Sequence, residues 1–308
     1  MPSWQAQLLS VYFRTVIRRG TWGQELALAR RARRHMGTPR PLQKLRTFGL
    51  RLSPVEEGAV RGEWVEPPAP EAGALLYFHG GGYVAGSPGT HRPITAGLAR
   101  LGRRRVFAPD YRLAPEHRFP AATDDAFAAY RYLLDGGLPA SSVALAGDSA
   151  GGGLVLATLL RARDEGLELP ACAVCFSPWA DLTGSGESSR LNDGRCVFLR
   201  TDNCGEFAAA YLGAASPLDP YASPLFGDLG GLPPVLLQVG STELLLDDAR
   251  RVHEKIREAG GLSELEVFDD VPHVWQMLDG FVPEARAALL GAVRFIDRHL
   301  AGAPAGRR

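Results

Sequence analysis

The chain has 308 residues, of which 45% are hydrophobic and 22% charged, so it can build one large globular domain or two with a sizeable core. Its 34 basic and 34 acidic residues balance, which gives no overall field that favours nucleic acid, and the basic run Arg30–Arg34 is expected to be a solvated helix face. No apolar stretch reaches the roughly 18 residues that cross a bilayer, and arginines at Arg14, Arg18 and Arg19 interrupt any signal-peptide core. We therefore expect a cytoplasmic protein with neither a membrane nor a nucleic-acid partner.

The N-terminal segment, from Pro2 to about Met36, predicts two helices before any strand. Apolar residues recur there at helical spacing, at Leu8, Leu9, Tyr12, Phe13, Val16 and Ile17 and then at Leu26, Leu28 and Ala29. Alternating runs from Arg46 to Val65 predict a pair of antiparallel strands, and the rigid loop Pro67–Pro70 is expected to close that hairpin region.

From residue 74 onward, strands and helices alternate. The expected strands are Ala74–Phe78, Arg105–Ala108, Val143–Ala146, Ala171–Phe176, Val235–Val239 and Glu264–Phe268, and the expected helices lie near 94–101, 121–134, 150–163, 245–259 and 283–299. This alternation predicts an α/β fold with a mostly parallel eight-stranded central sheet and helices on both faces. The last strand is expected at a sheet edge, where it invites pairing into a homodimer.

One segment, Trp179 to about Leu218, interrupts the alternation. It is rich in Ser, Gly and Asp and shows no clear strand, but it contains one helical piece near Glu206–Leu212. Because it lies between two sheet strands, we expect an insertion that passes over the strand ends.

Two glycine-containing motifs carry the chemistry. Gly147–Gly151 (Gly-Asp-Ser-Ala-Gly) places Ser149 between an expected strand and an expected helix, the setting in which a serine is presented on a strained turn. The glycine run His79–Gly82 (His-Gly-Gly-Gly) follows another expected strand and offers N–H groups of the kind that stabilise a tetrahedral oxyanion. Gly-x-Ser-x-Gly alone is a weak signal, but the two motifs in this order predict acyl transfer.

A nucleophilic serine needs a histidine base, which in turn needs an orienting acid. The competing histidines are His35, His253 and His299 in expected helices, His79 in the glycine run, and His91 and His117 in early loops where structural hydrogen bonds are expected. His273 follows the final strand, where the chain order serine, acid, histidine requires the base. For the acid we favour Glu243, the first carboxylate after the strand that ends at Val239. Asp247 is the alternative, although Asp247 and Asp248 suit the start of the next helix.

These residues resemble the bacterial hormone-sensitive-lipase-like esterases, which have the α/β-hydrolase fold. The resemblance extends from about Leu75 to His299 and includes His79–Gly82, Asp110–Glu116, Gly147–Gly152 and the His273 loop. It implies a Ser149, Glu243, His273 triad, an oxyanion hole from the N–H groups of Gly80, Gly81 and Ala150, and a small-molecule ester substrate with no metal or organic cofactor. Many relatives have Asp followed by Pro-Leu where this chain has Glu243-Leu244-Leu245. Asp247 keeps the place of the family's second, non-catalytic acid.

The same resemblance implies a cap above the core. The expected organisation is N-terminal cap helices over 1–47, the core over 48–178 and 219–300, a cap insertion over 179–218 and a disordered tail over 301–308. We expect the substrate to be bordered by Tyr83, Asp148, Phe198 and Tyr211, with Trp179 and Phe207 as further apolar lining. The alternative is that these aromatic residues only pack the cap onto the core. Asp110 and Glu116 are expected to form a structural, salt-bridged loop.

Other functions remain open at this stage. The same triad serves a deacetylase or a lactone hydrolase, and a hydrolase fold without its base serves as a small-molecule receptor, a role that the presence of His273 disfavours. The cysteine pair Cys172 and Cys175 has the spacing of a redox pair or of half a zinc site, but Cys196 and Cys204 do not complete a zinc pattern. We expect ordinary reduced core cysteines.

Overall fold

The computed structural model describes residues 2–12, 25–35 and 45–300. Within this part of the chain, one eight-stranded sheet has the order β1-β2-β4-β3-β5-β6-β7-β8. The strands are β1 (Arg51–Glu57), β2 (Val60–Glu66), β3 (Ala74–Phe78), β4 (Arg105–Pro109), β5 (Val143–Asp148), β6 (Cys172–Phe176), β7 (Val235–Gly240) and β8 (Ser263–Phe268). β2 pairs antiparallel with β1 and with β4, whereas every other neighbouring pair is parallel. The predicted α/β fold with a mostly parallel sheet is confirmed.

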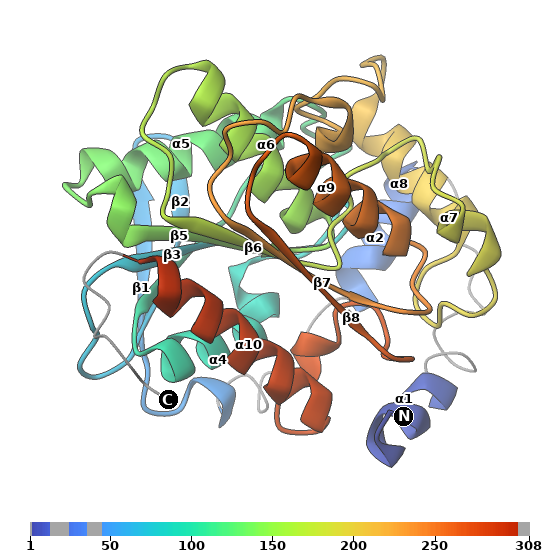
Figure 1. Cartoon of the computed structure of the whole chain (residues 1–308), viewed down its shortest axis with the longest axis horizontal. Coiled ribbons are helices and arrows are strands. Elements are labelled where there is room, and N and C mark those ends of the chain that lie inside the picture. Colours follow the sequence, from blue (N-terminus) through green and yellow to red (C-terminus); the bar gives the residue numbers. More distant parts are fainter. Residues whose placement is uncertain (1, 13–24, 36–44, 301–308) are drawn as a thin grey trace.

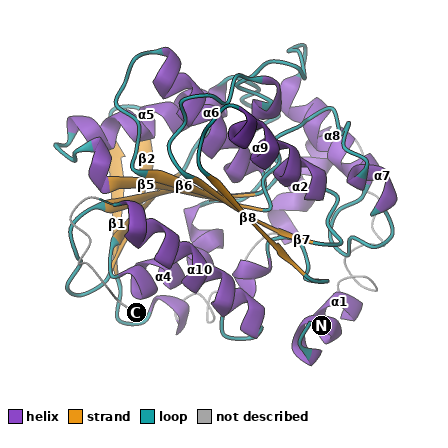
Figure 2. Cartoon of the chain, in the orientation of Figure 1, coloured by secondary structure: helices purple, strands orange, loops and turns teal. Residues whose placement is uncertain are grey.

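Helices cover both faces of this sheet. The helices of the described residues include α1 (Trp4–Tyr12), α2 (Glu25–His35), α4 (Arg92–Gly102), α5 (Ala121–Asp135), α6 (Ala150–Asp164), α7 (Ser188–Leu191), α8 (Thr201–Leu212), α9 (Leu246–Glu258) and α10 (Pro283–His299). Figures 1 and 2 show α5, α6 and α9 on one face and α4 and α10 on the other, as βαβ crossovers require.

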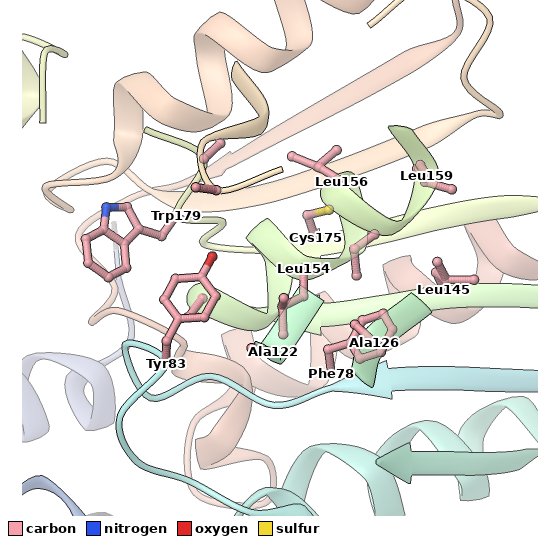
Figure 3. Close-up of a cluster of buried hydrophobic side chains, with 14 of the residues drawn as sticks. Phe78, Tyr83, Ala122, Ala126, Leu145, Leu154, Leu156, Leu159, Cys175 and Trp179 are labelled. Atoms are coloured by element: carbon pink, nitrogen blue, oxygen red, sulfur yellow. The ribbon is translucent and has the colours of Figure 1, made fainter. Parts of the chain in front are cut away.

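The core forms two layers because successive strand residues point to opposite faces. In β5, Val143 and Leu145 pack in the layer under α5 and α6, and Ala144 and Ala146 pack in the layer toward α4 and α10. Figure 3 shows part of the first layer, where leucines of α6 lie beside Leu145. α6 is buried along most of its length, so the helix that follows Ser149 is held from several sides.

Two of the cysteines belong to these layers. Cys172 and Cys175 are three residues apart in β6 and pack on opposite faces, the first toward α4 and α10 and the second toward α6. All four cysteines are free, and burial raises the pKa of the Cys172 thiol to about 12. The prediction of core cysteines is confirmed for Cys172 and Cys175, and their opposite faces do not suit a redox pair.

The N-terminal part of the chain differs from the predictions at the hairpin loop and at Leu8. The hairpin of β1 and β2 turns at Gly58 and Ala59. The prediction that Pro67–Pro70 closes this hairpin is therefore wrong, because that loop follows β2. Both N-terminal helices are present as α1 and α2, but Phe13, Val16, Ile17 and the tail 301–308 lie outside the described residues. Leu8, expected from its spacing to lie on an apolar stripe, is 63% exposed.

The inserted segment Trp179–Leu218 contains α7 and α8. Figure 1 shows both helices gathered with α2 at one end of the sheet, and α2 contacts α8. Among the described helices, none combines the length and the apolar character that a membrane span requires.

Candidate active site

Ser149 lies on a sharp turn directly between β5 and α6. Its backbone has φ +52° and ψ −120°, a conformation that a non-glycine residue adopts only at a cost. A Cβ at Gly147 would lie 2.4 Å from the carbonyl oxygen of Gly151, and one at Gly151 would lie 2.0 Å from the carbonyl oxygen of Phe78. Because the backbones already touch, only glycine fits on either side of Ser149.

His273 links Ser149 to Glu243. Its Nε2 lies 3.0 Å from the Ser149 hydroxyl oxygen, and its Nδ1 lies 2.5 Å from Oε2 of Glu243. With Nδ1 donating to the carboxylate, the lone pair of Nε2 faces the serine hydroxyl, which is the arrangement a general base needs. The structure thus brings together three side chains from the loops that follow β5, β7 and β8.

Glu243 is held in place by three further partners. Its Oε1 accepts hydrogen bonds from the N–H of Gly240 at 2.6 Å and from the hydroxyl of Ser177 at 2.8 Å, and its backbone carbonyl accepts one from Asn192 at 2.9 Å. The side chain of Glu243 is 1% exposed. The carboxylate is therefore fixed in orientation and stays available to His273 through its second oxygen.

The two neighbouring aspartates hold the inserted segment. Asp247 accepts a hydrogen bond from the N–H of Ser188 at 2.7 Å, and Asp248 accepts from the N–H groups of Ala180 and Asp181, both at 2.9 Å. Both aspartates lie in the first turn of α9, as expected. Burial raises the pKa of Asp248 to about 8, and the charge of nearby Asp181 adds to this effect. Asp247 is therefore engaged away from His273.

The glycine run differs from its expected role at one residue. The N–H of Gly80 donates to Oδ1 of Asp148 at 3.0 Å, so its single proton points at a buried carboxylate and does not face a substrate. The expectation that Gly80 stabilises an oxyanion is wrong for this reason. Within the described residues, the N–H groups of Gly81, Gly82 and Ala150 have no hydrogen-bond acceptor. Gly81 and Gly82 have φ values of +125° and +61°, which glycine adopts without strain.

Asp148 also lies elsewhere than expected. It is 2% exposed and its carboxylate lies beneath the glycine run, where it accepts hydrogen bonds from Gly80 and from the hydroxyl of Tyr77 at 2.5 Å. The expectation that Asp148 contacts substrate is therefore wrong, because its buried carboxylate is engaged by Tyr77 and Gly80 beneath the glycine run.

Comparison with known proteins places this geometry in a family. A family model described as the α/β hydrolase fold matches residues 75–277. An acetyl-hydrolase from Streptomyces hygroscopicus is 45% identical over 242 residues, which cover 79% of this chain and 81% of the relative. An esterase from the bacterial hormone-sensitive lipase family has a crystal structure that matches with a TM-score of 0.88 and 38% identity, covering 98% of this chain and 100% of that one. The chain belongs to the hormone-sensitive-lipase-like esterases. An esterase from Acinetobacter venetianus is also similar, at 36% identity over 80% of this chain and 82% of its own.

Aromatic side chains of this esterase form a packed group beside the glycine run. Tyr83 and Tyr211 stack with ring centroids 3.8 Å apart and are 1% and 0% exposed, and Trp179 lies 5.9 Å from Tyr83 (Figure 3). A Cβ at Gly82 would lie 2.9 Å from the ring of Phe207, so α8 rests directly on the glycine run. Tyr83 and Tyr211 thus pack the inserted segment onto the core, the alternative considered above, while Phe198 is half-buried.

The loop Asp110–Glu116 of this esterase is tied to α2. Arg33 forms an ion pair of 2.7 Å with Glu116 and donates to the carbonyl oxygens of Val84 and Ala114. The expected salt bridge at Glu116 is confirmed, but its partner comes from α2, so Arg33 is not part of a merely solvated helix face.

The described residues contain no group of three or more His, Cys, Asp or Glu side chains arranged to hold a metal ion.

Proposed function

We propose that this esterase hydrolyses short-chain carboxylic esters with Ser149 as nucleophile, His273 as general base and acid, and Glu243 as the orienting carboxylate. The observation that carries the proposal is the continuous chain of two hydrogen bonds from Glu243 through His273 to Ser149. A fixed imidazole with one nitrogen on a carboxylate and the other on a hydroxyl is the arrangement that activates a serine.

The reaction follows from this geometry. As the Ser149 oxygen attacks the ester carbonyl, its proton passes to Nε2 of His273, and the charge of the resulting imidazolium is stabilised by Glu243. The tetrahedral intermediate collapses when the imidazolium gives that proton to the leaving alcohol. Water then attacks the acyl-enzyme by the same route and releases the carboxylic acid.

The oxyanion of each tetrahedral intermediate requires N–H donors that are not already engaged. We assign this role to Gly81, Gly82 and Ala150, with Gly82 in place of the expected Gly80. Ala150 is the first residue of α6, where N–H groups have no acceptor within the helix and carry the positive end of its dipole. Each donor of this kind is worth roughly 100- to 1000-fold in kcat.

The preference for short acyl groups is supported by the aromatic group around Phe207. Phe207 is 9% exposed and rests on Gly82, so α8 leaves little room directly above the glycine run. The similarity to an acetyl-hydrolase from Streptomyces hygroscopicus agrees with a small acyl group. We therefore propose acetyl and propionyl esters as the best substrates, with α2, α7 and α8 as the cap that covers the site.

The decisive experiment is Ser149→Ala, tested on p-nitrophenyl acetate and butyrate. Hydrolysis should fall by at least about 10⁴-fold, because the nucleophile is lost, while the unfolding temperature should change little. Ser141→Ala, an exposed serine just before β5, is the matched control and should keep full activity. Retained hydrolysis by Ser149→Ala would refute the assignment. A panel of N-acetyl amines and lactones, compared by kcat/KM, tests whether esters are the preferred class.

We also propose that β8 pairs two copies of the chain. β8 is the last strand in the sheet order, and Val267 on it is 42% exposed. Light scattering should give the mass of a dimer, and Val267→Pro should convert it to a monomer, since proline removes a ladder N–H. A monomeric wild-type protein would contradict this assembly.

A further inference from the structure

Beneath the glycine run lies a buried charged cluster that the proposed triad does not use. Asp148 immediately precedes Ser149, and its carboxylate is almost fully buried. A carboxylate in such a place is stable only if its oxygens are well partnered. The identity of those partners therefore indicates what the residue does.

Both oxygens of Asp148 are engaged from neighbouring elements. Oδ1 accepts from the Tyr77 hydroxyl and from the N–H of Gly80, and Oδ2 lies 3.4 Å from Nε2 of His91. A Cβ at Gly80 would lie 2.2 Å from Oδ2, so the glycine run rests directly against the carboxylate. The N–H of Gly80 is thus held by the carboxylate of Asp148 and not by a backbone carbonyl group.

The ring of His91 is held at both of its nitrogens. The Thr90 hydroxyl donates its only proton to the carbonyl oxygen of Ser87 at 2.8 Å, and the same oxygen lies 2.8 Å from Nδ1 of His91. The Thr90 hydroxyl thus holds one side of the imidazole ring. On the other side of the ring, Nε2 faces Oδ2 of Asp148, to which an N–H on this nitrogen donates.

The other titratable groups packed around this pair stay neutral near pH 7. The ring of His79 stacks 5.4 Å from His91 and 4.1 Å from Tyr111, and burial lowers the pKa of His79 to about 3. Burial also raises the pKa of Tyr77 and of Tyr111 well above the ordinary value. Burial raises the pKa of Asp148, but the charge of His91 and the hydrogen bonds from His91 and Tyr77 outweigh it, and the net shift is downward.

We propose that Asp148 and His91 form a buried pair that positions the glycine run, so that both residues support oxyanion stabilisation without touching the substrate. The proposal rests on the function assigned above. Asp148 holds Gly80 by its N–H, and this sets the direction in which the next two N–H groups, of Gly81 and Gly82, point. His91 holds the carboxylate in its place through Nε2. A displacement of about 1 Å in such donors can cost about 100-fold in rate.

The first test is Asp148→Asn, which keeps an acceptor oxygen and removes the charge. We expect kcat per active site to fall 10- to 100-fold while KM changes less than about threefold, because only the transition state carries the oxyanion. Active sites are counted by titration with a p-nitrophenyl phosphonate. The affinity for a trifluoromethyl ketone, which forms an oxyanion on Ser149, should weaken by the same factor as kcat.

The control is Asp297→Asn. Asp297 forms an ion pair with buried Arg104 on the other side of the sheet from α6, far from Ser149 in the chain. It should lower the unfolding temperature without changing kcat per titrated site. If Asp148→Asn behaves in the same way, with fewer active sites but unchanged kcat for each, its role is only structural and the proposal is overturned.

A double-mutant cycle tests whether the two residues act as a pair. His91→Gln should reproduce the kcat loss of Asp148→Asn, and the double variant should lose no more than the larger single effect. Additive losses would contradict the pairing. Failure of the proposed function would look different, since Ser149→Ala would then retain hydrolysis whatever happens in these variants.

Discussion

The serine turn and the inserted segment both lie at the proposed active site, but they are held in place by different kinds of contact. The turn that carries Ser149 is held by direct contacts between backbone segments. A Cβ added at Gly151, for example, would lie only 2.0 Å from the carbonyl oxygen of Phe78. The inserted segment is held by side chains: Asp247 and Asp248 bind its backbone N–H groups, and Phe207 packs on the glycine run. The first kind of contact tolerates almost no substitution, and the second should tolerate several.

Gly151→Ala is the substitution that we expect to be most damaging among those that test this difference. Because the new Cβ would lie within 2.0 Å of a carbonyl oxygen, either the turn or β3 must move, and we expect more than 1000-fold loss of hydrolysis together with a lower unfolding temperature. The matched control is Gly205→Ala in α8, where nothing lies within 4 Å of the added atom. There, alanine should keep full activity and stabilise the fold by about 0.5–1 kcal/mol. Similar losses for both variants would contradict the distinction.

The next largest effect concerns Glu243. Glu243→Gln keeps the size of the side chain but removes the charge that stabilises the His273 imidazolium, so we expect kcat to fall by about 10³- to 10⁴-fold with KM little changed. Asp247→Asn, four residues along the chain, is the control and should lose less than tenfold. If Asp247→Asn proves the more damaging change, the choice of the acid is wrong.

A smaller effect is expected in the inserted segment at Phe207. Phe207→Ala removes the ring that rests on Gly82, and the freed space should accept longer acyl chains. The ratio of kcat/KM for p-nitrophenyl octanoate to that for acetate should rise about tenfold. An unchanged ratio would show that Phe207 only packs α8 and does not limit the acyl group.

The smallest effect is a pH dependence at Asp248, whose pKa is raised by burial to about 8. The folded state then binds this proton more tightly than the unfolded state, so stability from this group is present below about pH 4 and is lost as the pH rises toward 8. Asp248→Asn cannot lose a proton. The unfolding temperature of the variant, relative to that of the wild type, should therefore be higher at pH 8 than at pH 5. Equal differences at both pH values would contradict the raised pKa.

The sequence predicted the fold because its signals are local. Each strand of the parallel sheet is a short apolar run between turn residues, and Val143–Asp148 and Ala150–Asp164 lie close to their expected bounds. α7 has only four residues, too few for a helical period to show, and it was missed. The Ser149, His273 and Glu243 positions were also predictable, because their chain order follows strand order in the sheet.

The directions in which the N–H groups and side chains of the site point were harder to predict from the sequence. The three glycines of the run are identical in sequence, so nothing in their pattern tells that Gly80 turns its N–H toward Asp148 while Gly81 and Gly82 do not. Asp148 could have been placed correctly by strand alternation, since it shares a face of β5 with Ala146, which packs toward α4 and α10. Its partner His91 comes from a distant loop, and only the tertiary structure brings the two together.

The central claim is that Ser149 carries the acyl group during hydrolysis. The direct measurement is to mix the wild-type enzyme with p-nitrophenyl acetate, quench with acid within the first turnovers and locate the acetyl group by peptide mass spectrometry. The account predicts a burst of p-nitrophenol and an acetyl group on the peptide that contains Ser149, with no burst in Ser149→Ala. An acetyl group on another residue, together with undiminished hydrolysis by Ser149→Ala, would contradict it.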